Sequence, residues 1–119
     1  MTDKTKNIIA LVLAVAVGAW MVLAGVGKLT GNEEAAAVFV KSGFPSWFKT
    51  VAGVLEIAGA VGLFIPKLRR LAAMCLIGLM CGALYTHFKL GDPILNYSGA
   101  FAVIVLLSAF LWLHYDDED

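Results

Sequence analysis

The sequence has few charged residues. Only 15% of its 119 residues are Asp, Glu, Lys or Arg, whereas about a quarter of a typical soluble domain is charged. Hydrophobic residues make up 61%, and the mean hydropathy is +0.85. The formal net charge is zero, and the sequence has no basic face of the kind that binds nucleic acid. The composition therefore predicts a protein whose solvent is the lipid bilayer.

Cysteine and histidine are also scarce. The two cysteines, Cys75 and Cys81, form no Cys-x-x-Cys motif, which argues against a thiol-exchange enzyme. Six residues apart on a helix, they lie on different faces and cannot form a disulfide bond. The two histidines, His87 and His114, fall at different helix ends, which excludes bis-histidine haem and zinc ligation. With no phosphate loop or Ser/His/Asp set either, we expect no catalytic residues and no metal site.

Long apolar runs, in contrast, cover most of the chain. There are four, each close to the roughly 20 residues that a helix needs to cross the hydrocarbon core. Pro45 and Pro66 bound the second run, and Pro93 opens the fourth, since proline fits the first turn of a helix and does not continue one. The sequence predicts an all-α, four-transmembrane-helix bundle that forms one integral membrane domain over residues 1–119. The predicted helices are residues 8–29, 47–65, 71–90 and 93–114.

The segments outside these runs suggest how the bundle lies in the membrane. Asn32 to Val40 predicts a short amphipathic interfacial helix between helices one and two. The first run is too long for a signal-peptide core, so we expect it to be retained. Basic residues flank the runs on one side and predict that both termini are cytoplasmic, in a bacterial-type plasma membrane. These basic residues are Lys4, Lys6, Lys67, Arg69 and Arg70.

One acidic residue, Glu56, interrupts the second apolar run near its middle. Ionisable residues at that depth are costly, and they face the bundle interior and pair or carry a function. Glu56 is therefore either a buried polar pin that fixes the bundle or a carboxylate that binds a proton or ligand, and the sequence leaves both interpretations open. Lys28, at the end of the first run, is the nearest partner, although it is also placed to reach the interface. With His87, these residues form the predicted polar intramembrane cluster.

Small residues accompany this cluster. Gly25 precedes Lys28 by three residues, while Gly53 and Gly59 flank Glu56 at the same spacing. Glycine at such positions lets a neighbouring helix approach closely, so we expect all three to lie at helix contacts. Gly78 and Gly82 form a Gly-x-x-x-Gly pattern, which favours packing inside the bundle over a dimer face.

Together these residues resemble a known family. The chain is similar to the DoxX-like membrane proteins over about two thirds of its length, with short motifs in the same order. The resemblance implies a small four-helix membrane protein; the namesake is associated with a sulfur-linked quinone oxidoreductase, and other relatives belong to membrane oxidoreductase complexes. Distant eukaryotic relatives act as chaperones or cargo receptors. The motifs are Gly25-x-x-Lys28-Leu29-x-Gly31, Gly43-Phe44-Pro45, Gly53-x-x-Glu56-x-x-Gly59-Ala60, Arg70-Leu71-Ala72-Ala73 and Met80-x-Gly82-Ala83 with His87.

Two functions follow from this reading. The first is an accessory or scaffold subunit of a membrane-associated complex, such as a quinone-linked oxidoreductase, with the bilayer and another protein or a second copy as partners. The second is a membrane binding protein in which Lys28, Glu56 and His87 line a pocket for a quinone or another lipophilic molecule. The absence of catalytic residues favours the first, and the mid-membrane carboxylate favours the second. Neither needs a cofactor other than a bound quinone.

Overall fold

The computed structural model describes residues 2–30, 37, 40–41, 43–91 and 98–114. It contains four helices in the order α1 (Asp3–Leu29), α3 (Ser46–Gly62), α4 (Arg69–Leu90) and α5 (Ser98–Leu113), and the described residues include no strand. This confirms the all-α prediction with four long helices. The predicted interfacial helix after α1 falls largely on residues 31–36, 38–39 and 42, outside the described residues.

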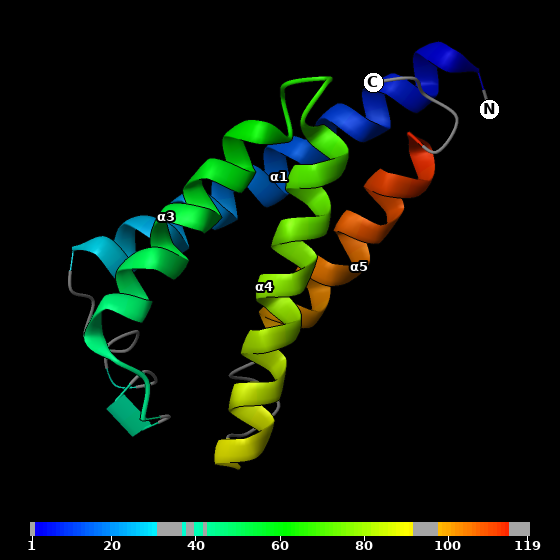
Figure 1. Ribbon diagram of the computed structural model, residues 1–119. Helices are drawn as coiled ribbons and strands as arrows, with labels where there is room; N and C mark the ends of the chain where they lie inside the picture. Colours follow the sequence, from blue (N-terminus) through cyan, green and yellow to red (C-terminus); the bar gives the residue numbers. More distant parts are fainter. Residues whose placement is uncertain (1, 31–36, 38–39, 42, 92–97, 115–119) are drawn as a thin grey trace.

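The helices pack in a ring. Contacts join α1 with α3, α3 with α4, α4 with α5 and α5 with α1. Figure 1 shows the start of α1, the turn between α3 and α4, and the end of α5 at one end of the molecule, which we call the turn end. From there α3 and α4 diverge toward the opposite end (Figure 1). This divergence decides which of the candidate site residues can meet.

The first two helices depart from the predicted bounds. The first helix begins at Asp3, before the apolar run, because Thr2 caps it: the Thr5 N–H donates to the Thr2 hydroxyl at 3.2 Å. The second helix ends at Gly62, three residues before Ile65. Residues 63–68 form turns instead, with the Phe64 N–H donating to the Val61 carbonyl at 3.1 Å, and Pro66 in this segment has no N–H to extend the helix.

The last two helices agree better at their carboxyl ends. α4 ends at Leu90 as predicted, because Gly91 adopts the left-handed conformation (φ 74°) and its N–H donates to the Phe88 carbonyl at 3.1 Å. Its start at Arg69 is two residues earlier than predicted. α5 is described from Ser98, so the predicted start at Pro93 lies outside the described residues.

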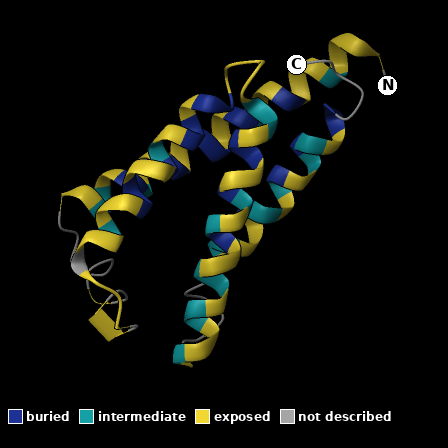
Figure 2. Cartoon of the chain, viewed as in Figure 1, coloured by how far each residue is buried: buried dark blue, intermediate teal, exposed yellow. Residues whose placement is uncertain are grey.

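The core lies where the ring is closed. Its largest fully buried side chains are Met21, Leu76, Leu107, Val17 and Val103. In α4 the buried residues Ala72, Ala73, Leu76 and Met80 all come before Cys81, while residues 81–90 are exposed or partly exposed (Figure 2).

Apolar side chains also cover the outside of the bundle. Leu23 on α1 and Phe88 on α4 are each 75% exposed, and Trp112 on α5 is 71% exposed. Contiguous apolar surface of this kind is rare on soluble monomers and suits a membrane or partner contact. By length and composition, α1 and α4 are each able to cross a membrane; α5 is apolar but shorter.

The glycines of α3 and α4 differ in their surroundings. A Cβ at Gly59 would lie 2.7 Å from Leu76, and one at Gly62 would lie 2.8 Å from the Ala72 Cβ, so these glycines let α4 approach α3. A Cβ at Gly78 or Gly82 would meet no atom of the described chain within 4 Å. The packing predicted for Gly78 and Gly82 inside the bundle is therefore not what this structure contains, because the buried face of α4 lies on the opposite side of the helix.

We expect Gly59→Ala to lower the thermal stability of the detergent-solubilised protein and Gly78→Ala to preserve or raise it. Both changes gain similar helix propensity, but only the first forces a methyl group into the fully buried Leu76, and overpacking costs about 1–3 kcal/mol. Thermal unfolding of the two variants measures the difference. Equal midpoints would contradict the close α3–α4 contact.

Candidate functional site: a lysine–glutamate pair between α1 and α3

An ion pair joins the two helices. The Lys28 Nζ lies 2.8 Å from Glu56 Oε1 and donates a hydrogen bond to Oε2 at 3.1 Å. The Glu56 side chain is 3% exposed and that of Lys28 is 19% exposed. The ammonium therefore contacts both oxygens of a carboxylate that is enclosed by the protein.

Two glycines make this pair geometrically attainable. A Cβ at Gly25 would lie 2.7 Å from the Gly53 carbonyl oxygen, and a Cβ at Gly53 would lie 3.0 Å from the Gly25 carbonyl oxygen. The two backbones therefore touch, and any side chain at either position would push the helices apart. Lys28 and Glu56 each follow one of these glycines by three residues, which is about one helical turn.

The lysine side chain runs along α3 to reach its partner. A Cβ at Gly53 would lie 3.1 Å from the Lys28 Cβ, so the lysine stem starts against α3 one turn before Glu56. One turn is about 5 Å, a distance that an extended lysine covers. This explains how a residue in the last turn of α1 reaches a carboxylate in the interior of α3.

The arrangement satisfies the buried charge. A carboxylate removed from solvent is destabilising unless it is paired and hydrogen-bonded, and Lys28 supplies both contacts. The ammonium has three N–H groups, of which these contacts use two. The partly exposed Lys28 side chain is therefore the more accessible member of the pair.

His87 is not part of this pair. In the described part of the chain, no hydrogen bond or ion pair links it to Lys28 or Glu56, and it makes other contacts. His87 lies beyond Met80, the last buried residue of α4. Its membership in one polar cluster with Lys28 and Glu56 stays a prediction.

A second polar contact, at the turn end, was not predicted. Arg70 Nη2 donates to the His114 carbonyl at 2.9 Å and ties the start of α4 to the end of α5. The His114 ring packs edge-on against Phe110 with centroids 4.8 Å apart, and His114 is 5% exposed. From the sequence, Arg70 is a basic residue at the start of one helix and His114 a histidine at the end of another. This does not predict a hydrogen bond to the main-chain carbonyl of His114.

An open apolar hollow also lies between α1 and α3. Its lining includes neither Lys28 nor Glu56, so the ion pair does not open into it. Sequence analysis did not single it out, because its small residues, Gly18 and Ala60, are common in membrane helices generally. The hollow is lined by Gly18, Val22, Ala60, Val61, Phe64 and Ile65.

The described residues contain no group of three His, Cys, Asp or Glu side chains that could hold a metal ion. Cys75 and Cys81 are both exposed as free thiols. Lys28 and Glu56 are thus the charged groups that the described fold brings together in its interior.

The residues around this pair match a known family over most of the chain, from residue 12 to residue 112. The chain belongs to the DoxX-like family. A curated Bacillus subtilis (strain 168) protein, "Uncharacterized protein YdgD", is 30% identical over 83 residues, which cover 66% of this chain and 73% of that protein. No solved structure matches the chain.

A double-mutant cycle tests whether the pair stabilises the fold. Lys28→Met should destabilise the protein strongly, since removing one partner of a buried pair costs about 3–5 kcal/mol. Glu56→Gln should cost less, because the partly exposed lysine can turn toward solvent. The double variant should be more stable than the sum of the two losses predicts, and thermal unfolding in detergent measures all four proteins. Additive losses would mean that the two side chains do not interact.

Proposed function

We propose that this DoxX-like protein is an integral membrane protein that serves as an accessory or scaffold subunit of a membrane-associated complex. All four helices cross the bilayer, with both termini on the cytoplasmic side. A quinone-linked oxidoreductase complex is the setting that the family resemblance suggests. In this proposal the protein helps to assemble the complex, and the partner protein carries out the reaction.

The observation that carries the proposal is that Glu56 is buried and fully paired with Lys28. Glu56 is 3% exposed, and both of its oxygens contact Lys28. A carboxylate placed for proton transfer or ligand binding needs access to its substrate. Here both carboxylate oxygens bind Lys28 and so join α3 to α1. A buried charge paired in this way has a structural role.

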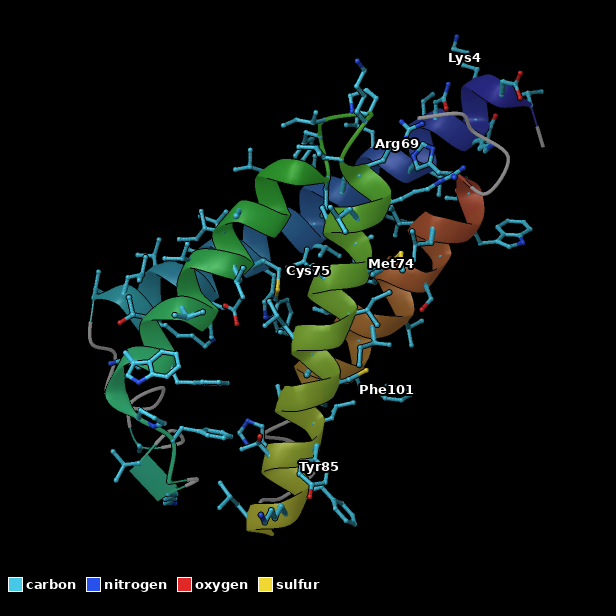
Figure 3. All side chains as sticks on the ribbon, viewed as in Figure 1. Lys4, Arg69, Met74, Cys75, Tyr85 and Phe101 are labelled. Carbon is cyan, nitrogen blue, oxygen red and sulfur yellow. The ribbon has the colours of Figure 1, made fainter. Side chains whose placement is uncertain are left out.

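The outward face of α4 supplies a surface for a partner. Leu71, Met74 and Tyr85 are 68%, 61% and 66% exposed, and the open Gly78 and Gly82 lie on the same side of the helix. A small-xxx-small pattern between larger side chains lets another membrane helix approach closely. Figure 3 shows Tyr85 directed away from the bundle at the far end of α4.

The alternative function is a polar intramembrane site for a quinone or another lipophilic molecule. One observation favours it: the Lys28 side chain is 19% exposed and has a third N–H, which can donate to a ligand carbonyl. Extraction of the purified protein with organic solvent would detect a bound quinone. Its loss in Lys28→Met, with retention in Lys89→Met, would favour this function over the scaffold.

The orientation gives a testable prediction. With both native cysteines replaced by alanine, single cysteines at Asp3 and Leu68 should be protected from an impermeant maleimide in intact bacteria, whereas one at Lys89 should react. The reason is that positions 3 and 68 lie at the turn end and position 89 at the opposite end of α4. Labelling of positions 3 and 68 from outside would reverse the orientation, and labelling on opposite sides would contradict four spans.

The scaffold proposal predicts a stoichiometric partner that depends on the α4 face. A tagged chain, crosslinked in membranes and purified in mild detergent, should retain one protein in a fixed ratio. The double variant Gly78→Ile/Gly82→Ile should lose it at unchanged thermal stability, because no described atom is displaced. Ala102→Ile, an exposed position on α5, is the control and should keep the partner. A wild-type chain that purifies alone, or as copies of itself, would contradict a scaffold for another protein.

A further inference from the structure

The apolar hollow between α1 and α3 lies next to a cluster of positive charge. Its lining runs along the last turns of α3 to Phe64 and Ile65, just past the end of that helix. Lys67 follows Ile65 by two residues and is exposed. Two residues span at most about 7 Å of chain, so the base of Lys67 is close to the mouth of the hollow.

Further basic residues lie near Lys67 in the chain. Arg69 and Arg70 open α4, whose first turn contains no acidic residue, although acidic residues are preferred at this positive end of a helix. Figure 3 shows Arg69 and Lys4 at the turn end. Positive side chains at a helix amino terminus favour a nearby anion. Lys67 is the exposed member of the group that is closest in the chain to the hollow.

We propose that the hollow and Lys67 form a binding site for one anionic phospholipid. An acyl chain lies in the hollow, and the lipid phosphate contacts the Lys67 ammonium. Arg69 and Arg70, which make contacts of their own, add to the positive potential there. This inference rests on the membrane insertion proposed above and adds the chemical class of a lipid partner.

The chemistry of the hollow selects a lipid over a soluble anion. Every lining residue is apolar or glycine, and Val61 and Phe64 are 54% and 49% exposed, so the site opens sideways to the surroundings of the bundle. A soluble phosphate compound has no apolar part to place against such walls, whereas an acyl chain can pack against them. The cation selects an anionic headgroup over a zwitterionic one, because a basic residue near an anionic membrane surface contributes about 1 kcal/mol.

Binding to the full chain in an uncharged detergent tests both halves of the site. Native mass spectrometry should show that phosphatidylglycerol binds about fivefold more tightly than phosphatidylcholine with the same acyl chains. Lys67→Gln should remove this preference, and Lys89→Gln, an exposed lysine at the opposite end of α4, should retain it. Val61→Phe should weaken both lipids by filling the hollow. Val54→Phe, on the same helix and 51% exposed, should weaken neither.

Three results would overturn the site. They are equal binding of the two lipids to the wild-type chain, an equal effect of Lys67→Gln and Lys89→Gln, and protection from thermal unfolding by inorganic phosphate as effective as that by phosphatidylglycerol. A different result would contradict the proposal that the protein spans the membrane: alkaline carbonate, without detergent, would release the chain from the membrane fraction. A chain that requires detergent and shows no lipid preference would refute this inference alone.

Discussion

The rest of the structure depends on the need of one buried carboxylate for a partner. Glu56 is enclosed in an apolar helix, and Lys28 is the residue that satisfies it. That contact fixes the register of α1 against α3, because a shift of one turn would move the ammonium by about 5 Å and leave the carboxylate unpaired. Gly25 and Gly53 make the register possible, since their backbones touch where the lysine stem begins. The charge pair selects the register, and the glycines permit it.

The position of α3 then determines the rest of the bundle. Its Gly53 side packs against α1, while Gly59 and Gly62 receive Leu76 and Ala72 of α4. These contacts lie toward the turn end, and α4 has no buried residue beyond Met80. One feature, the short region of close packing around the carboxyl half of α3, thus accounts for the tight core near the turn and for the exposed outer part of α4.

The sequence predicted the parts that depend on local chemistry. Apolar runs and prolines located the helices to within a few residues, and the scarcity of charge made Lys28 and Glu56 stand out. The end of α3 was placed three residues too late, because the apolar residues Leu63–Ile65 suit either a helix or a turn. The surroundings of His87 and of the Gly78-x-x-x-Gly82 pattern do not follow from the sequence, because residue spacing shows which side of its own helix a residue occupies but not which neighbour lies beside it. The Arg70–His114 contact uses a main-chain carbonyl, which side-chain identity does not reveal.

The internal pair also separates two roles of charge in this chain. Lys28 and Glu56 have opposite charges and lie within 3 Å of each other, so together they add little net field to the bundle interior. Any electrical asymmetry between the two ends of the molecule must therefore come from charge at the helix ends, where Lys4 and Lys67 are exposed. A buried pair of the same net charge could be exchanged for apolar residues without altering that asymmetry. Internal charge sets the helix register, and charge at the helix ends sets the electrical asymmetry of the molecule.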